Sequence, residues 1–179
     1  MNNETFELFF SMLSVALLAG TLVVLVARML HSRSTAARTV ISAFAPWALP
    51  LAAAVTTTCA LGSLYFSEIV NYKPCIMCWY QRTMMYPLAV ILIIAAITKD
   101  KRVWRYATPL AAIGIVFSTY HWFLERFPNL DAGVCDAEVP CEFVWFENFG
   151  FVTLPFMALT GFLAVLVFTT LPNTQTEQS

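Results

Sequence analysis

Residues 73–98 read KPCIMCWYQRTMMYPLAVILIIAAIT, so that a closely spaced cysteine pair leads directly into an apolar run. About 20 mostly apolar residues are enough to cross a bilayer as a helix. Inside hydrocarbon the backbone must satisfy its own hydrogen bonds, and an open chain does so only as a helix. Working outward, the other apolar runs lie at about 6–30, 45–67, 106–124 and 151–171. We expect the short apolar core of the quoted run, 83–98, to be lengthened by the residues before it.

These runs predict an all-α integral membrane protein, a four-helix transmembrane bundle with one extra N-terminal transmembrane helix. The composition agrees, because 59% of the 179 residues are hydrophobic and 12% are charged. A soluble domain has about 45–50% apolar and about 25% charged residues. The net charge of −1 and the lack of a basic patch with interleaved aromatic residues argue against a nucleic-acid partner.

The charged residues predict how the bundle is oriented in a cell membrane. Two connections carry seven of the ten basic residues: Arg28, Arg33, Arg38, Lys99, Lys101, Arg102 and Arg105. Basic loops stay on the cytoplasmic side. We therefore expect the N-terminus outside, the C-terminus in the cytoplasm, and both cysteine loops, 68–82 and 125–150, on the outer side. Disulfides persist in that compartment.

The chain divides near residues 32–44, which separate the first apolar run from the rest. We expect residues 1–43 to form an anchor helix and its cytoplasmic connection, because the run exceeds a signal peptide's apolar core and its basic flank follows it. We expect residues 44–172 to form a four-helix unit with all five cysteines, and residues 173–179 to form a disordered cytoplasmic tail.

The first pair is Cys75-x-x-Cys78. This spacing commonly lowers a thiol pKa. Pro74 suits the start of a helix, which would place Cys78 in the first turn, where the helix dipole favours a thiolate. Arg82 follows four residues later, on the same helix face, and adds a positive charge near that sulfur. The alternative is that Arg82 has no role in the chemistry and only extends its charged end from the membrane interface toward water.

The second pair, Cys135 and Cys141, is close enough in sequence for a local disulfide. Its neighbours Asp136 and Glu138 are acidic and raise a thiol pKa. That suits a disulfide attacked by the thiolate of a partner, since exchange depends on access as well as on pKa. The aromatic stretch 143–149 (FVWFENF) is interpreted as a segment on the membrane surface, and the alternative is a docking patch for a partner.

His121 lies near the outer end of its apolar run, at about the depth of Arg82. It is predicted to handle protons or to hydrogen-bond a bound cofactor, with Glu125 one turn later as its possible partner. The alternative is an amphipathic anchor. Cys59 is alone in the middle of an apolar run and is interpreted as a small hydrophobic residue.

Two cysteine pairs on one face of a bilayer indicate a relay that passes electrons from a soluble partner into the lipid. Two alternatives stay open from the residues alone. The pairs could be structural disulfides in a membrane subunit without enzymatic activity, or the four cysteines could bind zinc.

The chain resembles the DsbB family of membrane disulfide-formation proteins, and most of all its BdbC-type branch. The resemblance covers about residues 47–171 and is carried by 62–69 (GSLYFSEI), 74–82 (PCIMCWYQR), 85–88 (MYPL), His121, 139–141 (VPC) and 149–151 (FGF). It implies a four-helix bundle that reoxidises a thioredoxin-fold thiol oxidase, like DsbA or BdbD. The electrons would pass to a membrane quinone, either ubiquinone or menaquinone, and sustain disulfide formation in exported proteins.

The resemblance also implies roles for single residues. Cys75 and Cys78 match the pair next to the quinone, with Cys78 engaging it and Arg82 beside it. His121 is a looser match to a histidine near the quinone. In the loop pair, Cys135 would form the mixed disulfide with the partner, and Cys141 would complete the pair.

Two features depart from the family pattern. Residues 8–30 add a helix, and the second cysteine pair is closely spaced. The nearest rival is a vitamin-K-epoxide-reductase-like quinone reductase. In that class we would expect the loop pair to precede the C-x-x-C motif, whereas here it follows.

Overall fold

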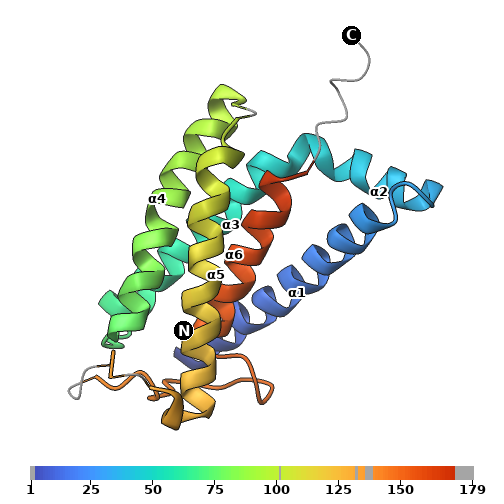
Figure 1. The fold of residues 1–179 in the computed structure, drawn as a ribbon. Coiled ribbons are helices and arrows are strands. Elements are labelled where there is room, and N and C mark those ends of the chain that lie inside the picture. Colours follow the sequence, from blue (N-terminus) through green and yellow to red (C-terminus); the bar gives the residue numbers. More distant parts are fainter. Residues whose placement is uncertain (1–2, 101, 132, 136–138, 172–179) are drawn as a thin grey trace.

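The structure is a computed structural model that describes residues 3–100, 102–131, 133–135 and 139–171. The predicted tail at 173–179 lies outside these residues. The described part is all-α, as predicted, and its one pairing of extended backbone is an isolated bridge between Asn148 and Val152. Figure 1 shows the six α-helices: α1 (Asn3–Met29), α2 (Thr35–Phe44), α3 (Ala48–Leu64), α4 (Ile76–Thr98), α5 (Trp104–Arg126) and α6 (Leu154–Thr169).

Within the described residues, four helical stretches are long and apolar enough to cross a membrane: α1, the stretch Thr35–Ile69, α4 and α5. The lengthening expected for the run at 83–98 is confirmed, because α4 begins at Ile76. The fifth run is helical only over the 16 residues of α6. Its start is delayed by a tight turn in which Phe149 and Gly150 have positive φ.

α6 occupies the centre of the bundle and contacts α1, α3, α4 and α5 (Figure 1). Its side chains Phe162 and Val165 are fully buried. The other helices therefore shield much of α6 from lipid.

The segment predicted to be a plain connection, residues 32–44, is largely helical. The side chain of Ser34 caps α2 by accepting a hydrogen bond from the backbone N–H of Ala37, and Ile41 is buried below it. A short 3₁₀ turn, Ala45–Trp47, then continues α2 into α3. Figure 1 shows that α2 lies across one end of the bundle, so that α1 folds back beside α6.

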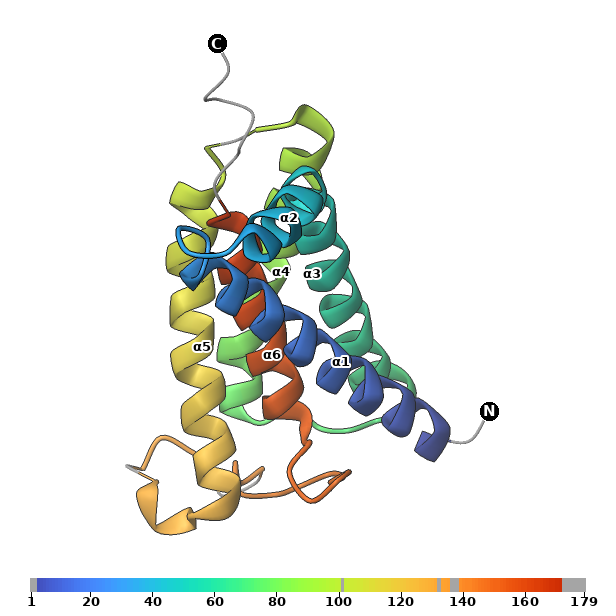
Figure 2. The same cartoon turned by 90° about the vertical axis from the view of Figure 1, so that its right-hand side faces the viewer.

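α1 packs against the bundle. It contacts α6, and in Figure 2 it crosses α6 obliquely. The buried face of α1 carries small residues, among them Ser11, Ser14 and Ala27, which allow close approach of two helices. Near its N-terminal end, the ring of Phe10 lies 3.1 Å from the position that a Cβ would take at Gly62 of α3.

The two cysteine segments lie at the same end of the bundle, as expected. Figures 1 and 2 show the start of α4, the segment after α5 and the N-terminal end of α1 at this end. The α2 helix and the α4–α5 turn lie at the opposite end.

Candidate redox site

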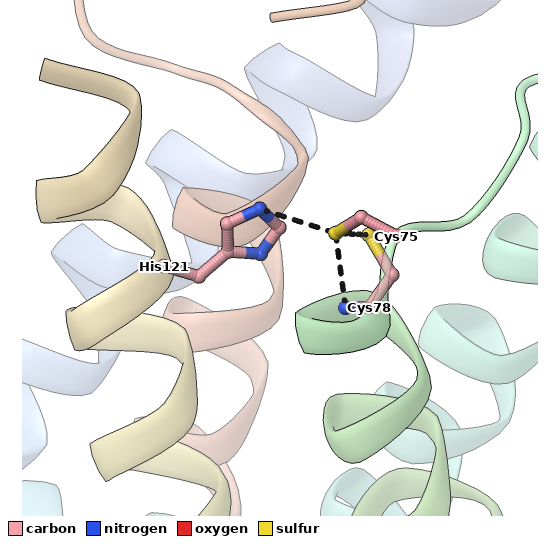
Figure 3. A group of neighbouring side chains, drawn as sticks. All are labelled: Cys75, Cys78 and His121. Atoms are coloured by element: carbon pink, nitrogen blue, oxygen red, sulfur yellow. Dashed lines mark hydrogen bonds between the residues drawn. The ribbon is translucent and has the colours of Figure 1, made fainter. Parts of the chain in front are cut away.

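Cys75 and Cys78 occupy the first turn of α4, as the sequence predicted for Cys78. Cys75 is the N-cap residue, and its Sγ accepts a hydrogen bond from the backbone N–H of Cys78 at 3.4 Å. The two sulfur atoms lie 3.2 Å apart, within hydrogen-bonding distance (Figure 3). Asn71, with a φ of 64°, turns the chain between α3 and this pair. The cap therefore holds both thiols beside one another at a helix N-terminus.

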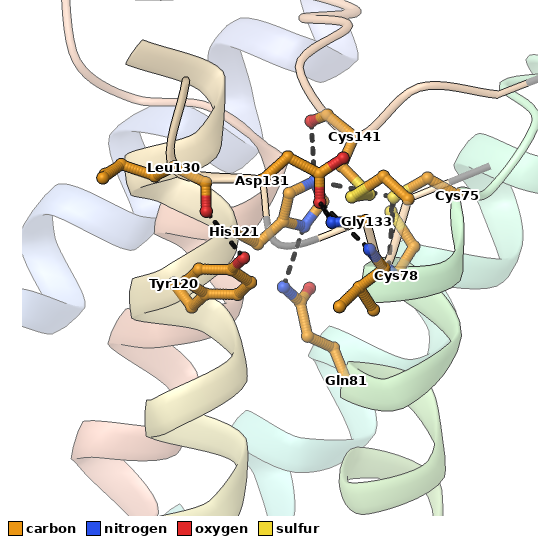
Figure 4. Close-up of a disulfide and its surroundings, with 11 residues drawn as sticks. Cys75, Cys78, Gln81, Tyr120, His121, Leu130, Asp131, Gly133 and Cys141 are labelled. Atoms are coloured by element: carbon orange, nitrogen blue, oxygen red, sulfur yellow. Dashed lines mark hydrogen bonds between the residues drawn. A yellow bond between two sulfur atoms is a disulfide. The ribbon is translucent and has the colours of Figure 1, made fainter. Parts of the chain in front are cut away.

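His121 reaches from α5 to both cysteine pairs (Figure 4). Its Nε2 lies 3.5 Å from the Sγ of Cys75 and 3.2 Å from the carbonyl oxygen of Cys141. Its Nδ1 lies 3.1 Å from the amide nitrogen of Gln81. Because an amide nitrogen only donates, Nδ1 accepts and the proton of the neutral ring is on Nε2. The imidazole therefore donates toward the Cys75 sulfur and the Cys141 carbonyl.

Gln81 was not predicted to have a role. It is buried, with 7% of its surface exposed, and it orients His121. The signal that could have revealed it is its place one helical turn after Cys78, on the face that also carries the thiol.

Contacts in this cluster stabilise a thiolate on Cys75. The hydrogen bond with Cys78 and the smaller effect of His121 together lower the pKa of Cys75 to about 4, against the opposing effect of burial. The helix dipole alone favours a thiolate on Cys78, the residue expected from the sequence. The structure favours Cys75, because its sulfur receives the backbone N–H at the cap as well as the two side chains.

Cys135 and Cys141 form the local disulfide that their spacing allows, with their Cα atoms 5.7 Å apart. Cys141 is buried in a small apolar cluster with Cys75 and Leu124. A shallow pocket lies between the two pairs, and its walls include Cys75, Cys135 and Val139. The predicted acidic neighbours at 136 and 138 lie outside the described residues. The structure therefore brings the loop disulfide against the first pair on the Cys75 side.

Cys78 faces a different space, a cavity of about 330 Å³ whose walls are mainly apolar. It is named the large cavity because more residues line it than line the pocket between the two cysteine pairs. Arg82 lines this cavity beside Cys78, as expected from its position one turn later. Its guanidinium donates to the hydroxyl of Ser63 at 2.9 Å and to the Ser63 carbonyl at 3.0 Å. Trp79 lies against the same group, with its ring centre 5.3 Å from the guanidinium carbon. A fixed positive charge thus stands at the cavity wall next to a thiol.

His121 does not line that cavity in the described structure. Of the two residues predicted to bind a cofactor, Arg82 lies at the large cavity and His121 lies at the dithiol. The suggested partner Glu125 accepts a hydrogen bond from the Thr153 hydroxyl at 2.6 Å instead. The lone Cys59 is a free cysteine that contributes to the apolar wall of the large cavity.

The aromatic stretch 143–149 lies partly over the large cavity. Trp145 stacks on Tyr72 with ring centres 4.4 Å apart and lines the cavity. Phe143 and Phe149 remain exposed, which fits the predicted surface segment. One part of the stretch therefore covers the cavity, and another part presents apolar side chains on the surface of the protein.

Cys75, Cys78 and His121 could also hold a metal ion, since their ligand atoms lie within 4.8 Å of one another. A zinc site made of four cysteines, the alternative that the sequence leaves open, would also need Cys135 and Cys141 as ligands. In the structure Cys135 and Cys141 are bonded to each other and are not available as ligands. A metal held by the first pair would block thiol–disulfide exchange there.

This geometry defines a class of protein, a membrane protein in which a dithiol and a disulfide face each other at the end of a helical bundle. The family model for the disulfide bond formation protein DsbB matches residues 45–171, and the chain belongs to this family. The match favours this family over the vitamin-K-epoxide-reductase-like alternative. Family membership supports a role in disulfide bond formation by a multi-pass membrane protein.

Similar proteins carry matching names. The chain is 46% identical over 108 residues to the "Probable disulfide formation protein C 1" of Bacillus cereus, covering 60% of this chain and 78% of that protein. It is 42% identical over 127 residues to the "Disulfide bond formation protein C" of Bacillus subtilis, covering 70% of this chain and 87% of that protein. No solved structure gives a significant match.

Proposed function

We propose that this protein is a quinone-dependent protein disulfide oxidoreductase. It reoxidises an extracytoplasmic thioredoxin-fold thiol oxidase and passes two electrons to a membrane quinone. One observation carries the proposal: Cys75 faces the loop disulfide, whereas its neighbour Cys78 faces a separate apolar cavity. The first pair therefore lies between a site for a protein thiol and a site for a membrane-soluble molecule.

The first step is an exchange with the partner at the loop pair. A thiolate of the reduced partner attacks the Sγ of Cys135, the bond to Cys141 breaks, and Cys141 leaves as a thiolate. The second partner thiolate then attacks the partner's own sulfur in this mixed disulfide and releases Cys135. The partner is now oxidised by two electrons, and the loop pair is reduced.

The second step passes the two electrons to the first pair in its oxidised form. Cys135 attacks the Sγ of Cys75, because these two residues share one pocket, and Cys78 is released on the side of the large cavity. Cys141 then attacks Cys135 and releases Cys75. A thiol of low pKa is a good leaving group, so the lowered pKa of Cys75 assists this release. The Nε2–H of His121 donates toward the departing sulfur.

The large cavity fits a quinone. Its walls are apolar, it lies between membrane helices, and it exposes a redox-active sulfur next to a cation. Arg82 gives two of its five N–H donors to Ser63, which leaves others for an acceptor oxygen. A bound quinone would supply the chemistry of a two-electron, two-proton acceptor. Arg82 would stabilise negative charge that develops there.

The lowered pKa of Cys75 also explains why a strong acceptor is needed. Stabilising the thiolate stabilises the reduced pair, which makes the disulfide a stronger oxidant. The partner would itself be oxidising, at about −120 mV for the strongest thioredoxin-fold oxidant. Only an acceptor of still higher potential can then regenerate the first pair.

The proposal includes an orientation and a division of the chain. Both cysteine segments and the N-terminus would lie outside, and the C-terminus would lie in the cytoplasm. In support, the first basic connection and the α4–α5 turn lie at the end of the bundle opposite the cysteines (Figure 1). Residues 44–172 would form the oxidoreductase unit, preceded by the additional segment 1–43.

The test is quinone reduction by the purified protein in detergent, with a reduced thioredoxin-fold oxidase as the electron donor. We expect turnover with ubiquinone or menaquinone analogues, its loss in Cys78→Ser, and its retention in the control Leu22→Ala, an exposed position that does not line the cavity. If no quinone is reduced and the disulfides resist the reduced partner, the pairs are structural and the proposal fails.

A further inference from the structure

We propose that α1 forms a wall of the quinone cavity, and that its residues Phe10, Leu13 and Leu17 help to determine which quinones bind. The inference rests on the proposed function and extends it to a helix outside residues 45–171, the part matched by the family. In this view the additional helix belongs to the acceptor site as well as to the membrane anchor.

One face of α1 points into the cavity. Phe10, Leu13, Ser14 and Leu17 all contribute to its lining. Their spacing of three and four residues places them in one row along the helix. The large side chains on other parts of α1, such as Leu22, are exposed on the outside of the bundle. A molecule that fills the cavity would therefore lie against this row.

Hydrogen bonds tie the outer end of α1 to both segments that flank the redox site. The hydroxyl of Tyr72, three residues before Cys75, donates to the carboxylate of Glu7. The amide of Asn148 donates to the hydroxyl of Ser11 at 2.9 Å, and Ser11 is fully buried. These bonds fix the position of α1 relative to the cysteines.

Aromatic contacts close the same end of the cavity. Phe10 of α1 packs against Phe66 with ring centres 5.7 Å apart. Phe66 stacks on Tyr72, and Tyr72 stacks on Trp145. This row of rings runs from α1 to the loop that covers the site. Together with the contact between Phe10 and Gly62, it links α1 to α3 at the wall of the cavity.

α1 lies on the quinone side of the redox site and not on the side where thiol–disulfide exchange takes place. In the described structure the pocket between Cys75 and Cys135 is lined by residues of the segments 74–79 and 134–139, and none of them belongs to α1. Changes on the inner face of α1 should therefore alter the use of the quinone and leave thiol–disulfide exchange with the partner intact. This separation makes the inference testable.

The experiment compares Leu13→Trp with Leu22→Trp. Both leucines are on α1 and nearly half exposed, at 41% and 49%, but Leu13 lines the cavity and Leu22 does not. The first readout is the KM for short-tailed ubiquinone and menaquinone analogues. The second is the single-turnover reduction of the protein's own disulfides by the reduced partner without quinone. Phe10→Ala, which enlarges the cavity, serves as a second variant.

We expect Leu13→Trp to raise the quinone KM about tenfold or more, the size typical of a mismatch in an apolar pocket. Its single-turnover rate should stay at the wild-type value, and Leu22→Trp should leave both readouts unchanged. Phe10→Ala should change the ratio of the KM values for the two quinone types. Unchanged KM values in both inner-face variants would overturn the inference.

A photoreactive quinone analogue on the wild-type protein gives a readout that does not depend on the folding of a variant. Labelling within residues 3–29 would support the inference, and labelling confined to the other helices would overturn it. A wild-type protein that reduces no quinone would instead count against the proposed function.

Discussion

At the scale of single residues, the groups around the Cys75 sulfur determine its chemistry. The Cys78 thiol contributes most, His121 adds to its effect, and the backbone N–H of Cys78 at the N-cap contributes less. The pKa of Cys75 is therefore lowered from 9.0 to about 4. Since the folded pKa is lowered, thiolate formation stabilises the reduced protein in full above pH 9. This contribution is lost as the pH falls through about 4.

Replacing Cys78 by Ala should raise the pKa of Cys75 toward its ordinary value, because the largest stabilising contact is removed. The pKa is measured from the pH dependence of alkylation of the reduced protein, followed at Cys75 by peptide mass spectrometry, in a background with Cys59, Cys135 and Cys141 replaced by Ala. His121→Ala in the same background, with Cys78 retained, should give a smaller rise. An alkylation profile that is unchanged by Cys78→Ala would contradict the proposed stabilisation.

At the scale of elements, the contact between α5 and α6 depends on a glycine. Gly114 of α5 faces Phe162 of α6, whose ring overlaps the position that a Cβ would take at residue 114. Phe162 is fully buried, so its ring cannot swing out into the surroundings of the protein. The absence of a side chain at Gly114 therefore lets α6 sit at the centre of the bundle, beside the helix that carries His121.

Gly114→Ala should destabilise the protein by about 1–3 kcal/mol, the usual cost of overpacking a core. Thermal unfolding in detergent measures the change. The matched control is Gly20→Ala on α1, where a Cβ meets no atom within 4 Å. We expect this control to be neutral or slightly stabilising, because Ala favours a helix more than Gly does. Equal stabilities for the two variants would mean that Phe162 can repack.

At the scale of the whole molecule, the two ends of the bundle differ in chemistry. The start of α4 with its cysteines, the segment after α5 and the N-terminal end of α1 share one end (Figure 2). The first basic connection and the α4–α5 turn share the other. Basic connections favour the cytoplasmic side, so this arrangement would present the disulfides to an oxidising compartment.

This orientation predicts the labelling of single cysteines introduced into a variant without native cysteines. In intact cells, a membrane-impermeant maleimide should label Glu147→Cys and should not label Lys99→Cys. After the cells are permeabilised, both positions should react, which controls for accessibility. The reverse pattern in intact cells would invert the proposed topology.

The sequence by itself determined the helical membrane architecture and the cysteine motif at a helix start. It could do so because lipid leaves an apolar run no alternative to a helix, and because spacing along one helix is a local property. The same local geometry places Cys78 in the first turn of α4 and Arg82 one turn later. The motifs were also specific enough to indicate the DsbB family, which the family match confirms.

Only the tertiary structure decided how distant segments meet. His121 lies beside Cys75 across 46 positions in sequence, and Gln81 orients it across 40. No local pattern encodes such contacts, because they depend on how α4 and α5 pack. The same holds for α1, whose apolar sequence fits a simple anchor equally well. The row of α1 side chains from Phe10 to Leu17 lines the cavity because small buried residues let α1 pack closely against α6.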